Sequence, residues 1–175
     1  MTITSIDAWG GLRKDLISTL GIERAKRLLI RYGWNTGKCE AKMLRESVQW
    51  ADDYEWLIAG TKMHHLTGRV FSYPETFNVD MEKGTFHVEG YWIDSYEAKE
   101  HLKYFPHHHE PICYFLMGYA GGYTSECMGK TIIFKEIQCV GKNDSHCSYK
   151  AKTLEQWGDE IEEELFYYKD IDISD

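Results

Sequence analysis

The chain has no apolar run close to the roughly 20 residues that a membrane-spanning helix requires. Its first residues, MTITSIDAWGG, lack the basic and apolar segments of a secretory signal peptide. It also lacks a GxxxxGK[ST] loop, the backbone cradle that P-loop proteins use for phosphate. These absences argue against an integral membrane protein and a P-loop nucleotide-binding protein. We therefore expect a soluble, cytoplasmic protein.

Positive charge is also scarce. The 175 residues include 20 Lys and Arg against 28 Asp and Glu, which gives a net charge of −8. The whole deficit falls in residues 155–175, where acidic side chains accompany Lys169 alone. No part of the chain has a basic stripe that could neutralise phosphates, so we expect no direct binding to nucleic acid. The apolar content of 43% is enough for one domain with a sizeable core.

Periodicity predicts helices in the first third of the chain and strands in the middle. Apolar residues recur every three to four positions in four predicted helices: 7–20 with Asp7 as cap, 22–32 with a break at Gly33, 41–50, and 52–61. Alternation predicts strands over 70–74, 76–81 and 85–92, with a turn at Lys83-Gly84. We then expect a helix over 95–105, a buried helix over 112–128, strands over 130–140 and 145–152, and a closing helix from Leu154. This order of elements is typical of the α+β class.

Five cysteines, an odd number without a secretory signal, make a disulfide framework the weaker interpretation. Glu136, Cys139 and Cys147 flank the turn of the last predicted hairpin, so their side chains should converge. Cys113, at the start of the predicted buried helix, is the natural fourth member. Three thiolates and one carboxylate suit zinc, and four protein ligands leave no open position, so the site would be structural. The alternative is that these are ordinary buried residues, because free cysteine packs readily in cores.

The other candidate ligands have simpler interpretations. Cys39 and Cys127 fit no ligand geometry, and we expect plain thiols. His107–His109 stand next to one another in a loop, where three adjacent imidazoles cannot all face one ion. By residue type alone, His64 and Trp92 are expected to be core side chains, each of which needs a polar partner.

Several segments resemble one known family. They are WIDSYEAKEHLKYF, EPICYFLMGYAGGYTSECMGK and KEIQCVGKNDSHCSYKAKTLEQWGDE, with LRKDLISTLGIERAKRLLIRYGWNTG and MHHLTGRV nearer the N-terminus. The sequence is similar to the 4-vinyl reductase-like sensor domain of XylR/DmpR/MopR-type bacterial activators of aromatic catabolism, from about Met1 to Trp157. The resemblance implies an α+β fold in which helices flank a twisted antiparallel sheet, and a homodimer.

The resemblance also implies roles for individual residues. The implied ligands of a structural zinc ion are Cys113, Glu136, Cys139 and Cys147. The implied partners of a phenol hydroxyl are His64 and Trp92. We add Tyr123 and Phe134 as candidates for the apolar wall of the pocket. Family members also have an extra N-terminal strand used in dimer contacts, an ATPase domain and a helix-turn-helix domain; this sequence holds none of them, which leaves the dimer mode open.

We therefore expect a binding module rather than an enzyme. Residues 1–153 would form a zinc-containing sensor of a small, phenol-like aromatic effector. Residues 154–175 would form an acidic amphipathic helix that begins a linker to ATPase and DNA-binding domains. The apolar seam of this helix would be Leu154, Trp157, Ile161, Leu165 and Tyr168.

Two other functions stay open at this point. One is an enzyme that acts on a vinyl or phenolic substrate with His64 as general acid or base. The other is a protein-assembly module. Turnover of a bound phenol would favour the enzyme, and failure to bind any small ligand would favour the assembly module.

Overall fold

The computed structural model describes residues 5–169 and 171, and its secondary structure is α+β, as predicted. The main helices are α1 (Ile6–Leu20), α2 (Ile22–Ser47), α3 (Asp53–Leu66), α4 (Tyr96–Tyr104) and α5 (Tyr114–Met128). The strands are β1 (Phe71–Asp80), β2 (Thr85–Ile93), β3 (Ile132–Gln138) and β4 (Cys147–Thr153). Short elements follow β3 and β4: the 3-10 helices η1 (Val140–Lys142) and η2 (Gly158–Ile161), and the helices α6 (Leu154–Trp157) and α7 (Glu162–Tyr168).

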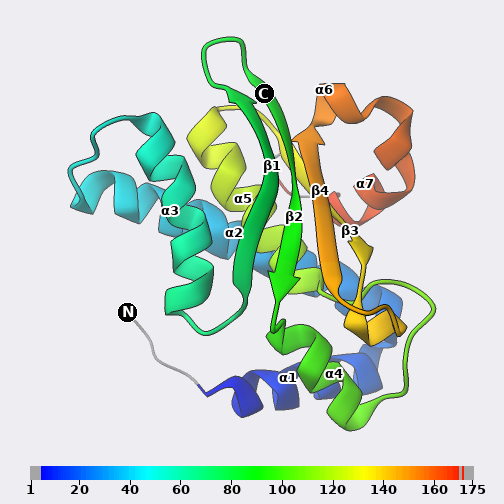
Figure 1. The fold of residues 1–175 in the computed structure, drawn as a ribbon. Coiled ribbons are helices and arrows are strands. Elements are labelled where there is room, and N and C mark those ends of the chain that lie inside the picture. Colours follow the sequence, from blue (N-terminus) through cyan, green and yellow to red (C-terminus); the bar gives the residue numbers. More distant parts are fainter. Residues whose placement is uncertain (1–4, 170, 172–175) are drawn as a thin grey trace.

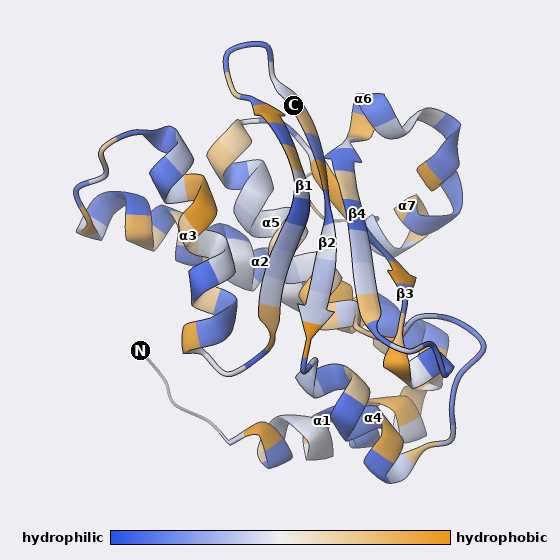
Figure 2. Ribbon diagram, in the orientation of Figure 1, coloured by the Kyte–Doolittle hydropathy of each residue, from blue (hydrophilic) through white to orange (hydrophobic). Residues whose placement is uncertain are grey.

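The strands form one antiparallel sheet in the order β1-β2-β4-β3. In Figure 1, α5 and α2 lie behind this sheet, α3 flanks β1, and α6 and α7 lie beyond β3 and β4. Side chains on β2 alternate between buried and half-buried, so one face of the sheet packs on the helices. Hydrophobic and hydrophilic bands alternate along α3 in Figure 2, as expected for a helix with one buried face.

Most helix starts follow the predicted caps. The side chains of Asp52 and Ser95 accept hydrogen bonds from the backbone N–H of Glu55 and Ala98, at 2.8 and 3.3 Å. The prediction of Asp7 as the first cap was wrong, because Ser5 accepts from the Ala8 N–H and Asp7 lies in the first turn. Within the described residues, no helix is both long and apolar enough to cross a membrane.

The predicted break at Gly33 was also wrong, because α2 runs unbroken from Ile22 to Ser47 and absorbs the helix predicted over 41–50. Glycine at this position serves the packing of α2 against α5. A Cβ on Gly33 or Gly37 would lie 2.3 or 2.1 Å from a carbonyl oxygen of α5. In return, a Cβ on Gly118 or Gly122 would lie 2.0 or 2.1 Å from a carbonyl oxygen of α2. The two backbones therefore touch directly, and we call these four positions the glycine contact.

This contact predicts a sharp difference between two glycine substitutions. Gly118→Ala should lower the free energy of unfolding by about 1 to 3 kcal/mol, because the added methyl group must push α2 away from α5. Gly11→Ala is the matched control, since it also lies inside a helix but its Cβ would meet nothing within 4 Å. That control should gain up to about 1 kcal/mol from its better helix propensity. Chemical denaturation measures both values, and equal effects would contradict the packing argument.

The middle of the chain differs from the prediction at two boundaries. The strands predicted over 70–74 and 76–81 are one strand, β1, with a bulge between Pro74 and Thr76. Proline is tolerated here because β1 is an edge strand, where one side of the ladder has no partner. The helix predicted to end at 61 continues to Leu66, which places His64 on its last turn.

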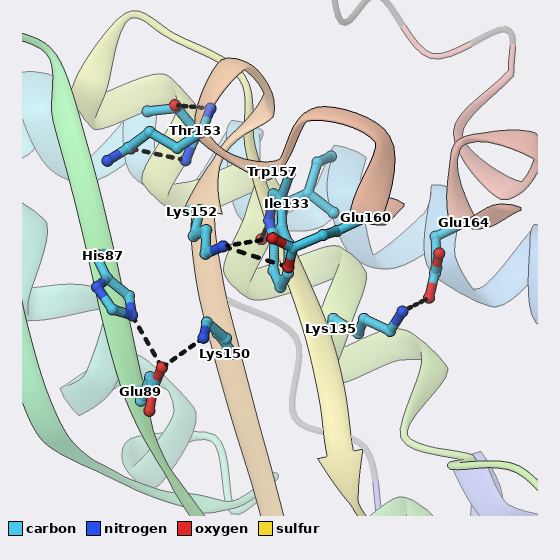
Figure 3. Close-up of polar contacts among 11 residues, drawn as sticks. His87, Glu89, Ile133, Lys135, Lys150, Lys152, Thr153, Trp157, Glu160 and Glu164 are labelled. Carbon is cyan, nitrogen blue, oxygen red and sulfur yellow. Dashed lines mark hydrogen bonds and ion pairs between the residues drawn. The ribbon is translucent and has the colours of Figure 1, made fainter. Parts of the chain in front are cut away.

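The closing segment is not one helix. Gly158 has a φ of 53° and separates α6 from η2 and α7. The segment still packs on the body, since Trp157, Ile161 and Tyr168 are buried. Figure 3 shows three of its anchors: the Trp157 indole N–H donates to the Ile133 carbonyl, and Lys152–Glu160 and Lys135–Glu164 form ion pairs.

Candidate metal centre and aromatic cavity

Four buried side chains meet where α5 begins and the β3–β4 hairpin turns. Cys113 is the N-cap residue of α5, and Glu136 lies on β3. Cys139 and Cys147 stand on either side of the turn that contains η1. Their candidate ligand atoms all lie within 4.8 Å of one another, and their exposed fractions are 4% or less. The structure thus brings together the four residues that the hairpin pattern predicted.

The distances in this cluster fit a tetrahedral cation. Sγ of Cys113 lies 3.9 Å from that of Cys139 and 4.0 Å from that of Cys147, and the latter two sulfurs are 3.9 Å apart. Metal–sulfur bonds of about 2.3 Å in a tetrahedron place sulfurs about 3.8 Å apart. Oε2 of Glu136 accepts from the Cys113 N–H at 2.9 Å, but its buried Oε1 has no hydrogen-bond partner. A cation held by the three sulfurs and Oε1 would satisfy this atom, so the residues fit a metal ion.

Neighbouring groups hold these ligands in place. The hydroxyl of Ser95, the cap of α4, lies 3.0 Å from Sγ of Cys113. The Cys139 N–H donates to the carboxylate of Asp144 at 2.8 Å, and the Val140 N–H donates to Sγ of Cys147 at 3.4 Å. Contacts of this kind orient metal ligands and tune their basicity. A bound ion would therefore join α4, α5 and the hairpin.

The protonation of the cluster also favours a cation. Burial raises the pKa of the Cys113 thiol and of the Glu136 carboxyl well above their usual values. Hydrogen bonds from the neighbouring thiols lower the pKa of Cys139 to about 2. A divalent cation would replace the protons that the other ligands carry. Metal binding should therefore release protons and weaken in acid.

An apolar cavity of about 50 Å³ lies between α3, α5 and the inner face of the sheet. Three residues with a predicted ligand contact line it: His64, Tyr123 and Phe134. The hydroxyl groups around it already have partners. Tyr123 donates to the Trp56 carbonyl at 2.9 Å, and the hydroxyls of Ser72 and Tyr149 lie 3.3 Å apart.

His64 is a neutral imidazole at this cavity. Its side chain is 3% exposed, and its ring centre lies 4.5 Å from that of Tyr119. Burial, together with the positive charge of Arg69, lowers the pKa of His64 to about 3. A neutral imidazole has one acceptor and one donor nitrogen, and Nδ1 is buried without a hydrogen-bond partner. His64 thus brings an unsatisfied polar group to an otherwise apolar lining.

Trp92 lies close to the cavity but does not line it. Its indole Nε1 is buried without a hydrogen-bond partner. The ring packs behind Tyr149, with 4.9 Å between ring centres, so Tyr149 would have to shift for the indole to reach the cavity. Trp92 is also paired with Cys147 across β2 and β4. It therefore lies between the metal cluster and the cavity.

Comparisons with known proteins agree with both features. The XylR_N family model, described as an activator of aromatic catabolism, matches residues 1–80, and the model of the 4-vinyl reductase domain matches residues 92–153. The solved structure of the phenol-responsive sensory domain of the transcription activator PoxR, with phenol, has 38% identity and a TM-score of 0.88. The match covers 97% of this chain and 84% of that one. The chain belongs to this family of sensory domains.

Two curated relatives are full-length regulators. The phenol regulator MopR of Acinetobacter guillouiae is 37% identical over 148 residues, which are 85% of this chain and 26% of MopR. The transcriptional regulatory protein XylR of Pseudomonas putida is 34% identical over 170 residues, which are 97% of this chain and 30% of XylR. The sensory domain described here thus spans less than a third of either regulator.

Sequence reasoning missed several cavity residues of this sensory domain, including Phe86, Val88 and Tyr149. A signal for them was present. Phe86 and Val88 share the strand period of Trp92, and Tyr149 shares that of Cys147, so each pair points to one face. Residues from α3, such as Leu57, had no such signal, because nothing in the sequence shows which side of α3 meets the sheet.

The remaining histidines and cysteines lie apart from the metal cluster of the sensory domain. His107 and His109 are exposed and His108 is half-buried. Cys39 is exposed, and Cys127 is buried in the core. Among the described residues, the side chains that could jointly hold a metal are the four already named.

The low pKa of His64 predicts a pH-dependent stability for the sensory domain. Below about pH 6.5 the unfolded chain protonates this imidazole, but the folded chain does not until about pH 3. The free energy of unfolding should therefore fall as the pH falls, by about 2 kcal/mol between pH 7 and 5 from this group alone. His64→Gln should lose that contribution, whereas His65→Gln, exposed on the same turn, should keep it. Urea denaturation over this range tests the difference, and parallel curves for wild type and His64→Gln would refute it.

Proposed function

We propose that this sensory domain binds phenol or a related small aromatic compound in the cavity beside His64. The observation that carries the proposal is a buried, neutral imidazole with an unpartnered nitrogen at an apolar cavity. A phenol supplies what this arrangement lacks, since its ring fills apolar volume and its hydroxyl can donate to the imidazole. The Trp92 indole would donate to the hydroxyl oxygen once Tyr149 moves aside. The relatives named for phenol support the same ligand class.

Binding requires the cavity to widen. Its volume of about 50 Å³ is smaller than the roughly 150 Å³ of a protein cavity that holds benzene. Ile58 of α3 and Phe77 of β1 line it and are also about 41% exposed, so they mark the side that faces solvent. We infer that the effector enters between α3 and β1. The bulge at Pro74 lies on this same wall.

We further propose that the metal is zinc and that its role is structural. The cluster supplies four protein ligands of the types that zinc prefers, and a tetrahedral ion would keep no open position for chemistry. Bound zinc would fix Cys147 on β4, and so would also hold Trp92, which is paired with it. The ion would thereby order the wall between the two features.

An enzymatic role has less support than a binding role. An acid–base catalyst needs a pKa near the working pH, and His64 lies far below it, at about 3. Among the described residues that line the cavity there is no second acid or base and no cysteine. Pure assembly has less support too, since a buried polar atom without a partner costs about 1 to 3 kcal/mol unless a ligand satisfies it.

In the natural protein we propose that ligand binding is relayed to ATPase and DNA-binding domains, in a cytoplasmic homodimer. The segment from Leu154 would begin the linker, because Trp157, Ile161 and Tyr168 pack it on the body. A relay requires the ligand to favour one of two arrangements of this segment. Hydrogen exchange over 154–168 should then change when phenol is added.

Calorimetry with phenol tests the proposed function. A seven-atom ligand with a ceiling near 1.5 kcal/mol per atom can reach roughly 10 kcal/mol, and we expect micromolar binding, about 8 kcal/mol. Phenol should be recovered unchanged after incubation. Conversion of phenol to a product would favour the enzyme, and no binding of phenol or of substituted phenols would refute the proposal.

A further inference from the structure

Phe134 on β3 lines two separate cavities. The first is the cavity of about 50 Å³ beside His64. The second has a volume of about 240 Å³ and lies between β3, α2, α5 and α7. Among the described residues, Phe134 is the one that the two linings share. Its side chain therefore stands between the effector cavity and a larger space under the C-terminal segment.

Aromatic neighbours hold this ring on the side of the effector cavity. The ring centres of Tyr149 and Phe86 lie 5.4 and 6.3 Å from that of Phe134, and both residues line the first cavity only. The Phe134 side chain is 6% exposed. On its other side lies the empty volume of the second cavity. Phe134 thus acts as a wall with packing on one side and space on the other.

The second cavity could accept an aromatic ring. Ile30, Met117 and Tyr168 give it an apolar wall near Phe134. Its charged residues are largely paired with one another: Lys26 with Glu110 at 3.1 Å, and Lys135 with Glu164 (Figure 3). The lysine charges are therefore already neutralised, and an uncharged ring would meet apolar surface and paired ions. The space is also too large to be filled by the movement of one side chain alone.

We propose that Phe134 sets the size limit of the effector, and that the second cavity is a closed-off subsite for a second ring. This inference rests on the proposed function, since it takes the phenol ring to lie beside His64. A single-ring phenol fits without removal of the wall. A two-ring phenol, with its hydroxyl at His64, would need the volume that Phe134 and the second cavity occupy.

The test uses phenol and 4-phenylphenol as probes, with calorimetry on the wild type and on Phe134→Ala. The wild type should bind phenol at least about tenfold more tightly than 4-phenylphenol, a difference of about 1.4 kcal/mol. Phe134→Ala should bind 4-phenylphenol at least about tenfold more tightly than the wild type does. Phe86→Ala is the matched control, because it also removes a ring from the first cavity but leaves the wall in place. Adding Ile30→Phe to Phe134→Ala should fill the second cavity and abolish the gain.

Three results would overturn the inference. They are equal affinities of the wild type for the two probes, an equal gain in Phe86→Ala, and a gain in Phe134→Ala that Ile30→Phe leaves unchanged. If Phe134→Ala does not fold, Phe134→Leu should show the same change in a smaller degree, and no change in that variant also counts against the inference. A crystal structure of the variant gives a readout without any ligand: one continuous cavity is expected, and two separate ones would contradict it. Failure of the wild type to bind any phenol refutes the proposed function instead, and leaves this readout standing.

Discussion

Replacing Cys147 with serine is expected to remove the metal and to destabilise the whole domain. The wild type should contain about one zinc ion per chain, and the variant close to none, because a serine hydroxyl is a poor substitute for a thiolate in this site. The ion would join α4, α5 and the β3–β4 hairpin, so its loss leaves buried thiols and the Glu136 carboxyl without a common partner. We expect a loss of more than about 3 kcal/mol in the free energy of unfolding, since metal binding is coupled to folding.

Two other cysteines provide the controls for this experiment. Cys127→Ser tests a buried thiol outside the cluster, and Cys39→Ser tests an exposed one. Both should keep full zinc content by atomic absorption, although Cys127→Ser will cost some stability as a polar group in the core. Cys113→Ser should behave like Cys147→Ser. Full zinc content in both of these variants would show that the four residues do not bind the ion.

Replacing His64 with alanine is expected to abolish the preference for phenol over toluene. The two compounds have nearly the same shape, so the wild type should distinguish them by the hydroxyl group alone. A desolvated hydroxyl without partners costs about 1 to 3 kcal/mol, which corresponds to a preference of about 5- to 150-fold. In His64→Ala the hydroxyl loses its acceptor, so phenol binding should weaken by this factor while toluene binding stays the same or improves with the added space.

His65→Ala is the matched control for His64. It is the next residue on α3, but its side chain is exposed and does not line the cavity. Calorimetry with both compounds on three proteins gives the complete comparison. Equal affinities of the wild type for phenol and toluene would mean that the cavity recognises hydrocarbon shape alone, and that His64 is a core residue.

The metal cluster could be predicted from the sequence because its geometry is local. Glu136, Cys139 and Cys147 lie on one hairpin, where strand period and a short turn fix which side chains meet. The fourth ligand, Cys113, is distant in the sequence but begins a helix whose apolar composition already placed it in the core. Distances between remote elements entered only through this one residue.

The shape of the cavity could not be predicted in this way. His64, Phe134 and Tyr123 were named as candidates, but their meeting depends on how α3, α5 and the sheet pack together. The same limit explains the wrong break at Gly33. A glycine in a helical pattern suggests an end when the neighbouring helix is unknown, and a close contact when that helix is in place.

The glycine contact also decides which parts of the molecule are mechanically stiff. Main-chain atoms of α2 and α5 touch there without side chains between them, so no rotamer change can relieve pressure across this surface. One wall of the cavity, formed by Ala120 and Tyr123, stands on this incompressible pair. The force exerted by an entering ring must then be absorbed by the softer walls, α3 and the strands. The helix pair would resist the deformation, and the sheet would transmit it to the rest of the domain.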